Sequence, residues 1–200
     1  MLRVQAGQTG LFAELIRRYQ PALLRVARSR LRRADWAEDA VQEALLAAYK
    51  FRHTYRNEFS FRTWLWTILL NQCRSLGQRD SRRPEAGSGG QDDGQCAVAV
   101  QSELSHPPPL AHLLARERSE LLQSLLSQLS TVQADALRLR FFAGLKFQEI
   151  ADTMGCSLGT AKNRVQWGLM KLSHLLESEV SYQSLAEDWL PSADSSRNAP

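Results

Sequence analysis

The sequence predicts an all-α protein of two small helical domains joined by a flexible linker, with a helix-turn-helix in the second domain. Apolar residues recur three or four positions apart on both sides of residues 84–110, as on the buried face of a helix. The segment between them holds the tract GSGGQDDGQ and three consecutive prolines, a composition typical of linkers. Near the C-terminal end, Gly155 separates two amphipathic stretches, as in a helix-turn-helix.

Charge is divided unevenly along the 200 residues. Residues 1–83 carry 16 Lys/Arg against 7 Asp/Glu, net +9, whereas residues 84–115 carry four acids and no bases, net −4. Residues 116–176 carry 8 against 5, net +3, and residues 177–200 carry 1 against 5, net −4. Two basic blocks indicate a polyanionic partner such as nucleic acid. The alternative is two unrelated solvated surfaces.

Residue usage predicts a reduced, cytoplasmic, soluble protein without enzymatic activity. The three cysteines, at 73, 96 and 156, are far apart, so neither a disulfide framework nor a zinc site is expected. No Ser/His/Asp, Cys/His or phosphate-loop arrangement is present, and the dispersed histidines lack metal-ligand spacing: His53, His106, His112 and His174. No apolar run reaches 18 residues. We therefore expect no cofactor, no metal and no membrane span.

The N-terminal block begins with two predicted helices. Residues 11–31 keep a helical stripe that Pro21 interrupts, which predicts two helices or a kink. The next helix, Ala37–Phe51, is expected to be capped by Asp35 or an adjacent residue, with Glu38 as the capping-box partner. Opposite its apolar stripe lies a polar face: Asp39, Gln42 and Glu43. These acids either form a binding surface or only favour the helix start through the helix dipole.

A helix is predicted within residues 59–83, where Phe61, Leu65, Ile68, Leu69 and Leu76 share one buried face. Other faces carry aromatic, aliphatic and basic residues that need another contact: Arg62, Trp66, Leu70 and Arg74. Aromatic rings stack on unpaired bases and arginines hold phosphates, so this helix suits nucleic acid. The alternative is a core helix with a solvated basic end.

The preceding segment, residues 52–60, lacks helical periodicity and predicts a loop. Tyr55, Asn57 and Phe59 stand there beside Arg52 and Arg56. Stacking and edge hydrogen bonds from such residues can hold an extruded base. A surface loop with incidental polar residues is the alternative.

The C-terminal block predicts a helix over residues 111–129 and a second helix over residues 132–143, capped by Ser130 and closed by Gly144. A helix-turn-helix then follows, with Phe147–Met154 as its first helix and Ser157 capping its second. The second helix exposes side chains suited to base edges and phosphates: Thr160, Lys162, Asn163, Arg164 and Gln166. A generic helical hairpin is the alternative. For the acidic tail from residue 178, disorder, folding back and docking on a partner all stay open.

Three passages resemble the sigma-70 family of RNA polymerase sigma factors, specifically the small extracytoplasmic-function (ECF) type. AEDAVQEALLAAYKF is similar to the family's helix that binds core polymerase, and FSFRTWLWTILLNQCRS to its promoter-melting, minus-ten segment. LKFQEIADTMGCSLGTAKNRVQWGLMKL is similar to its minus-thirty-five helix-turn-helix. The resemblance implies region 2 over residues 1–83, a linker over 84–110, region 4 over 111–176 and an acidic tail over 177–200.

The resemblance also implies site residues and partners. The residues implied to bind polymerase are those of the D-x-x-Q-E match: Asp39, Gln42 and Glu43. The residues implied to contact minus-ten DNA lie on the loop and the following helix: Tyr55, Asn57, Phe59, Phe61, Arg62, Trp64, Asn71 and Arg74. The residues implied to contact minus-thirty-five DNA lie on the second helix of the helix-turn-helix: Thr160, Lys162, Asn163, Arg164 and Gln166. Implied partners are core RNA polymerase, promoter DNA and an anti-sigma protein.

The sequence departs from the family pattern where that second helix continues. The family often has Arg-Ala-Arg there, but residues 166–170 read QWGLM, which predicts weaker phosphate binding unless Trp167 makes another contact. Gly168 within a helix is expected to cost up to ~1 kcal/mol relative to alanine. Two rival functions stay open from sequence: a stand-alone helix-turn-helix repressor, and an interaction protein whose basic modules dock on an acidic protein.

Overall fold

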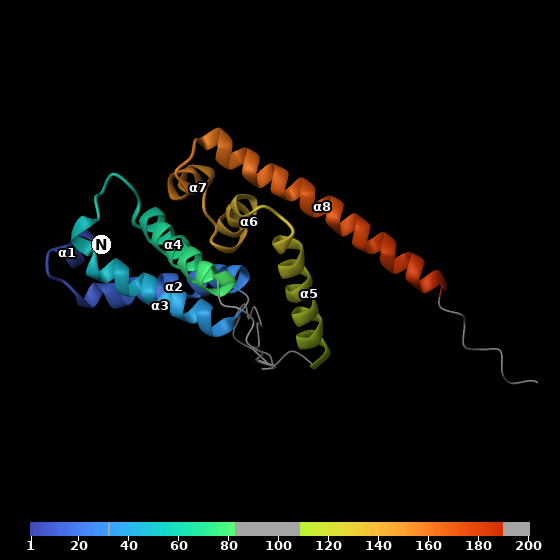
Figure 1. Ribbon diagram of the computed structural model, residues 1–200. Coiled ribbons are helices and arrows are strands. Elements are labelled where there is room, and N and C mark those ends of the chain that lie inside the picture. The colour runs from blue at the N-terminus through green and yellow to red at the C-terminus, as the bar shows by residue number, and fades with distance from the viewer. Residues whose placement is uncertain (32, 83–108, 190–200) are drawn as a thin grey trace, which may run out of the picture.

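The computed structural model describes residues 1–31, 33–82 and 109–189, and every regular element in these ranges is helical. The first half contains α1 (Leu2–Gln5), α2 (Gly10–Arg30), α3 (Ala34–Lys50), the short 3₁₀ helix η1 (Arg52–Thr54) and α4 (Phe61–Arg82). The second contains α5 (Pro109–Ser127), α6 (Thr131–Leu137), the π-helical turn η2 (Arg138–Phe142), α7 (Phe147–Met154) and α8 (Leu158–Trp189). Figure 1 shows the two helical domains, which confirms the predicted fold class. The predicted linker falls mainly on residues 83–108, outside the described residues.

Three helices form the core of the first half, with α3 packed against both α2 and α4. Alanines supply much of the buried face of α3, and small side chains let neighbouring helices approach closely. The expected break at Pro21 is wrong, because α2 is one helix that contains it. Proline removes one backbone donor. Phe12 before it and Leu23 after it are nevertheless buried in the same core, which keeps the two segments in one helix.

The predicted capping box at the start of α3 is also wrong. The helix begins at Ala34, and the Asp35 carboxylate accepts hydrogen bonds from the Trp36 N–H (2.9 Å) and from Arg33. Arg33 is the main reason that the pKa of Asp35 lies below its usual value. Glu38 does not reach back to the helix start but pairs with Arg28 of α2 at 2.9 Å.

Helix α4 is covered on two sides, which the sequence did not predict. Its expected apolar face packs on α2 and α3, and α7 of the second half packs on it as well. Trp66 and Leu70, which lie off the predicted stripe and were expected to need another contact, are 1% and 4% exposed. They are covered because α4 packs against α2 and α3 of the first half and against α7 of the second.

The second half is built on α6, which buries Ala136 and Leu137, while Leu139 of η2 is buried beside them. The helix predicted over residues 132–143 therefore exists, but residues 138–142 of it form the π-helical turn. Ser130 occupies the N-cap position without a side-chain bond to the backbone, and its hydroxyl contacts Gln133 instead. Gly144 follows with φ +64°, the left-handed conformation expected of a residue that closes a helix.

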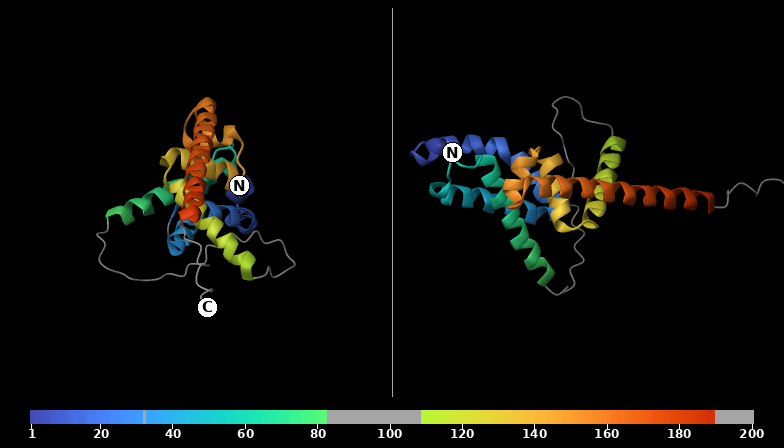
Figure 2. Two further views of the ribbon diagram at one scale, coloured as in Figure 1. Left: turned by 90° about the vertical axis from the view of Figure 1, so that its right-hand side faces the viewer. Right: turned by 90° about the horizontal axis from the view of Figure 1, so that it is seen from above.

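The helix-turn-helix is confirmed in detail. Gly155 ends α7 with φ +60°, and the Ser157 hydroxyl accepts the Thr160 N–H at 3.1 Å, which caps α8. Helix α8 then runs to Trp189 and so includes much of the predicted tail, while residues 190–200 lie outside the described residues. Figure 2 shows its C-terminal part extending away from the rest of the molecule.

Candidate nucleic-acid and protein interfaces

The three predicted residues of α3 share an exposed surface. Asp39, Gln42 and Glu43 are all exposed, while Ala40, Val41 and Ala44 face the core. The face exists because the helical repeat separates these two sets around α3. It gives the first half an acidic surface in a block that is otherwise strongly basic.

An apolar groove borders this acidic surface, and sequence reasoning missed it. The groove lies between α2 and α3, has a volume of about 750 Å³, and is lined by Phe12, Ile16, Leu24, Gln42, Leu46 and Tyr49 among others. Leu46 is 55% exposed although it is a leucine. One signal was available: Leu46 follows Gln42 by four residues and so shares the polar face. Exposed apolar surface beside charge is typical of a protein-binding site.

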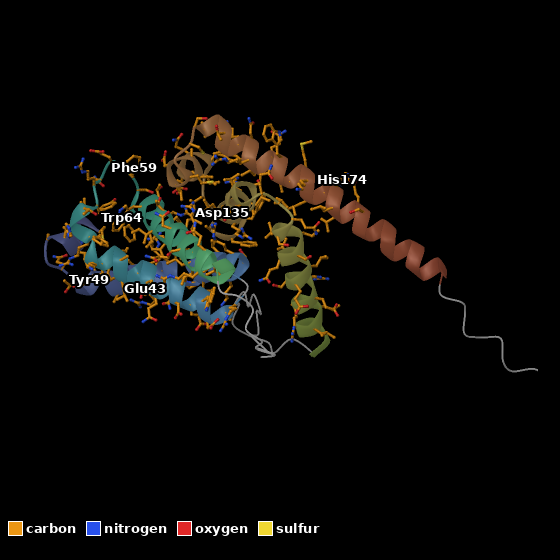
Figure 3. The ribbon with its side chains drawn as sticks, in the orientation of Figure 1. Glu43, Tyr49, Phe59, Trp64, Asp135 and His174 are labelled. Carbon is orange, nitrogen blue, oxygen red and sulfur yellow. The ribbon has the colours of Figure 1, made fainter. Side chains whose placement is uncertain are left out.

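The loop between η1 and α4 is held in place by side-chain hydrogen bonds from α1 and from within the loop. The Gln5 amide donates to the backbone oxygens of Arg52 (2.6 Å) and Tyr55 (3.0 Å). The buried Tyr55 phenol donates to the Phe59 carbonyl at 3.0 Å, and burial raises its pKa, so the donor proton is retained. Asn57 and Phe59 are left exposed, Phe59 at 55%. Figure 3 shows Phe59 on this loop above Trp64.

The first turn of α4 holds an aromatic cluster. Phe61 packs edge-on against Tyr19 (centroids 5.6 Å apart) and Tyr55 (6.0 Å), and Trp64 lies 5.5 Å from Tyr55. Phe61 and Trp64 are both half-buried. The cluster therefore supports the loop, and Phe59 offers the most exposed ring at this end of the helix.

The other predicted residues of α4 do not join that surface. Arg62 turns toward the second half, where its guanidinium donates to the Ala143 carbonyl and lies 3.5 Å from the Glu149 carboxylate. Asn71 and Arg74 are exposed further along the helix and bond to each other at 3.1 Å. The eight predicted minus-ten residues are thus divided among a loop, a buried support and two separate sides of α4.

Four of the five side chains predicted to be exposed on α8 are exposed. Thr160, Lys162, Asn163 and Gln166 are exposed, while Ala161 and Val165 are buried. Arg164 is half-buried and its guanidinium approaches the Met154 sulfur at 3.9 Å, so it lies partly against α7. Two apolar side chains further along, Trp167 and Met170, are more than half exposed.

Two family models match this chain in the order of its two halves. "Sigma-70 region 2" matches residues 15–83, which include the acidic face, the loop and α4. "Sigma-70, region 4" matches residues 119–172, which include the helix-turn-helix. This chain belongs to the sigma-70 family.

Curated relatives place this sigma factor among the ECF type. It is 29% identical over 163 residues to the RNA polymerase sigma-H factor of Pseudomonas aeruginosa, and the matched residues make up 82% of this chain and 84% of the relative. It is 28% identical over 165 residues to the ECF RNA polymerase sigma-E factor of Escherichia coli, covering 82% and 85%. The sequence-based recognition is therefore confirmed, and the chain is a sigma factor that directs RNA polymerase to promoters rather than a stand-alone repressor.

Solved structures agree with the arrangement of helices. The sigma factor RpoE, solved in complex with the anti-sigma factor NepR from Bartonella quintana, matches with a TM-score of 0.61 and 25% identity, over 83% of this chain and 96% of that one. CnrH, solved with the cytosolic domain of CnrY, matches with a TM-score of 0.67 and 24% identity, over 88% and 94%, and supports the fold.

Within residues 1–31, 33–82 and 109–189, no helix of this sigma factor is long and apolar enough to cross a membrane. The same part of the chain brings together no group of three or more His, Cys, Asp or Glu side chains that could hold a metal ion. What the candidate site offers is exposed acid, aromatic and basic side chains on three separate elements.

Proposed function

We propose that this sigma factor binds core RNA polymerase through the exposed face of α3 and reads a two-part promoter through the 55–60 loop with α4 and through α8. It acts without catalysing a reaction itself, in the cytoplasm where polymerase works. One observation carries the proposal: each of the three predicted sets has exposed members, which lie on α3, on the 55–60 loop with α4, and on α8, while α3 and α8 bury their apolar faces behind them. Residues 1–83 serve as region 2 and residues 111–176 as region 4.

The polymerase contact combines charge with apolar surface. Asp39 and Glu43 supply negative charge one helical turn apart, and the groove with Leu46 supplies area that a partner side chain can fill. Interfaces of this composition gain affinity from the desolvated apolar centre, while charges at the rim steer the encounter. A basic or amphipathic helix of the polymerase is the partner that fits.

At the minus-ten element, Phe59 and Asn57 receive an unstacked base. Unstacking costs a few kcal/mol, and stacking on an aromatic ring returns ~1–3 kcal/mol per base. Tyr55 and Phe61 position the loop instead of touching DNA, because both are withdrawn into the aromatic cluster. Trp64 packs on Tyr55 from the first turn of α4 and so helps to position the loop. Asn71 and Arg74 hold the backbone of the adjoining duplex.

At the minus-thirty-five element, the first turns of α8 enter the major groove. Asn163 and Gln166 have the amide groups that pair with adenine edges, and Lys162 neutralises phosphate. Thr160 is placed by the Ser157 cap, and Arg164 must swing away from Met154 before it can reach a base or a phosphate.

An anti-sigma protein is the regulator that this proposal implies. RpoE and CnrH were each solved with a second protein bound, and the RpoE partner is named an anti-sigma factor. A comparable protein would inhibit this chain by covering the α3 face or the α8 face. The described part of this sigma factor contains no helix that could span a membrane, and binding of such a partner does not require one.

Binding to core polymerase tests the proposal most simply. The double variant Asp39→Ala/Glu43→Ala should be retained on immobilised core polymerase at least roughly tenfold less than the unchanged chain, because two rim charges are lost. Glu14→Ala is the matched control, since it removes an exposed carboxylate from α2 instead. Undiminished retention of the double variant would contradict the assignment of α3.

A further inference from the structure

The 55–60 loop is held at its start by a side chain that lies far away in the sequence. The half-buried Gln5 amide donates one hydrogen bond to the Arg52 carbonyl at 2.6 Å and another to the Tyr55 carbonyl at 3.0 Å. A side-chain amide nitrogen carries two N–H donors, and two acceptors are present here. Because both acceptors are carbonyl oxygens, the nitrogen of the amide must be the atom that faces them.

The two bonds connect a fixed point of the backbone to the start of the loop. Arg52 is anchored on α3, because its guanidinium donates to the Tyr49 carbonyl at 3.0 Å and lies 4.5 Å from the centroid of the Tyr49 ring. Tyr55 follows η1 in an extended conformation, with φ −65° and ψ 123°, so its carbonyl marks the point where the chain leaves that turn. Gln5 therefore sets the direction in which the loop departs from η1.

Two local contacts fix the rest of the loop. The Tyr55 phenol donates to the Phe59 carbonyl at 3.0 Å, and the Ser60 hydroxyl accepts the Thr63 N–H at 3.1 Å, which caps α4. Residues 56–60 are all exposed. The side chains proposed to receive a base are thus carried by a backbone that is held at three points, and the first of these points depends on α1.

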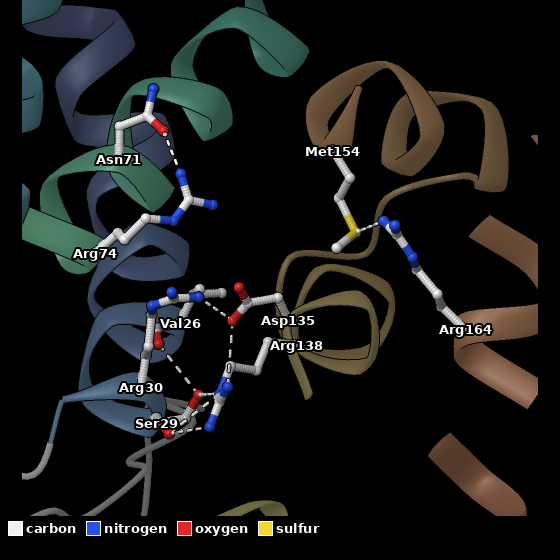
Figure 4. Close-up of polar contacts among 9 residues, drawn as sticks. All are labelled: Val26, Ser29, Arg30, Asn71, Arg74, Asp135, Arg138, Met154 and Arg164. Carbon is white, nitrogen blue, oxygen red and sulfur yellow. Dashed lines mark hydrogen bonds and ion pairs between the residues drawn. The ribbon is translucent and has the colours of Figure 1, made fainter. Parts of the chain in front are cut away.

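The predicted minus-ten residues further along α4 need no such support. Asn71 and Arg74 lie one turn apart on a continuous helix, whose backbone places them, and they bond to each other at 3.1 Å (Figure 4). A loop has no repeating backbone hydrogen bonds, so its shape depends on contacts with other parts of the chain. The Gln5 amide therefore supports the part of the site that local structure holds least.

Helix α1 does not depend on these hydrogen bonds for its own attachment. It packs against α2 and η1, and Val4 in its middle is 1% exposed. Met1 is packed against the same apolar core. Burial of apolar side chains stabilises a contact more than an exchangeable hydrogen bond does. Val4 therefore attaches α1 to the domain, and Gln5 acts on the backbone that it reaches.

A fixed loop matters because an extruded base needs a receiving surface that is already formed. If the loop were mobile, base capture would also have to order its backbone, and this loss of entropy would oppose the gain from stacking. Discrimination between bases also requires fixed groups, because a wrong base is rejected only where it leaves a polar group unpaired. Loss of the Gln5 bonds should therefore lower both strand opening and selectivity for the captured base.

We propose that Gln5 is a positioning residue of the minus-ten site, which holds the 55–60 loop in the conformation that receives an extruded base. The proposal rests on the promoter-reading function above and extends its site to α1, which precedes residues 15–83 of the region 2 match. In this role Gln5 touches neither DNA nor polymerase. It acts through the backbone of Arg52 and Tyr55.

Substitutions that keep the size of the side chain test the two donors. Gln5→Met removes both N–H groups, and Gln5→Glu replaces them by an oxygen that faces the two carbonyls. On a promoter mapped with the unchanged chain and core polymerase, permanganate reactivity of the minus-ten thymines should fall roughly tenfold for Gln5→Met and at least as much for Gln5→Glu. Gln8→Met and Gln8→Glu are matched controls, because Gln8 is exposed three residues away, and should leave it unchanged.

A change of the captured base separates positioning from a loss of stability. The second template carries a substitution at the minus-ten base that the mapped promoters share most strongly. Gln5→Met should reduce the preference for the natural base over the substituted one by about threefold or more. A variant that is merely less stable would open both templates less by the same factor. An unchanged preference in Gln5→Met, with retention on core polymerase also unchanged, would overturn the positioning role.

Cleavage by trypsin after Arg56 measures the loop without any promoter. Arg56 is exposed on the loop, and a protease acts on chain that has left its folded position. Gln5→Met should raise the rate of this cleavage roughly tenfold, whereas Gln8→Met should not; equal rates for Gln5→Met and the unchanged chain would contradict the proposal. If the unchanged chain opens no promoter at all, the promoter-reading function fails instead, whatever the cleavage rates show.

Discussion

At the scale of single residues, burial decides which of the predicted promoter residues can touch DNA. Phe59 is exposed at the loop. Tyr55, four residues earlier, is buried, and its hydroxyl donates a hydrogen bond to the Phe59 carbonyl. The two aromatics are equivalent in the sequence pattern, and only the fold separates a contacting residue from a positioning one.

Phe59 should therefore be the aromatic residue whose loss most affects strand opening. Phe59→Ala removes a ring worth ~1–3 kcal/mol of base stacking, so open-complex formation should fall by about 5- to 150-fold. Phe59→Tyr keeps the ring and should retain most activity. Permanganate reactivity of unpaired thymines at the minus-ten element measures the effect, and equal reactivity with Phe59→Ala would contradict the role of this ring.

Cys73 gives a residue-level test of the packing around α4. Burial, the largest cause, raises the pKa of this thiol to about 11, against 9.0 for an ordinary cysteine. The thiolate is the reactive form, so at pH 8 the native chain should alkylate at Cys73 roughly 100-fold more slowly than the unfolded chain. Mass spectrometry of the Cys73 peptide measures both rates. Equal rates would show that this side of α4 is open to solvent.

The same shift predicts a pH dependence of stability. Below pH 9 both folded and unfolded chains hold the proton on Cys73. Between pH 9 and 11 only the folded chain holds it, so unfolding releases a proton and stability falls as the pH rises. Cys73→Ala should lose this part of the alkaline decline in the melting temperature; an unchanged slope from pH 9 to 11 would count against the shift.

At the scale of elements, α8 shows why a feature that looks unfavourable in sequence can be required in the fold. Gly168 costs helix propensity, but a β-carbon there would lie 3.0 Å from Leu137 Cδ1 and 3.4 Å from Leu129 Cδ2. Leu137 is buried in α6 and is not free to move aside. The glycine thus lets α8 pack closely on α6.

Gly168→Ala should consequently destabilise the second half. Alanine gains up to ~1 kcal/mol of helix propensity, but overpacking against a buried leucine costs about 1–3 kcal/mol. A lower midpoint in urea denaturation is expected. Gly159→Ala, where a β-carbon meets only the Ser157 hydroxyl at 3.9 Å, is the matched control and should not lower it. A Gly168→Ala variant as stable as the unchanged chain would contradict the close packing.

Local sequence signals predicted these elements well where the cause is local. The Gly155 turn, the Ser157 cap and the apolar stripes of α3 and α8 depend on neighbours within one or two turns. Prediction failed where the cause is distant: Trp66 is covered although its position lies off the stripe, and α2 stays one helix through Pro21 because of its packing.

At the scale of the whole molecule, the sequence could show two halves but not their contact. Nothing in the local sequence marks Asp135 and Arg138 as buried, because their burial depends on Ser29 and Arg30 more than 100 residues earlier (Figure 4). The acidic face of α3 was predictable from spacing, whereas the groove beside it requires the position of α2. Exposed faces of single helices are thus visible in sequence, whereas contacts between distant elements are not.

The most direct test of the account is transcription by purified core polymerase on chromosomal DNA, with the 5′ ends of all transcripts mapped with and without this chain. New start sites should appear, preceded by two shared motifs near minus ten and minus thirty-five, and Asn163→Ala, which removes a base-edge contact, should weaken selection of the upstream motif alone. An unchanged set of start sites on adding the chain would contradict the account.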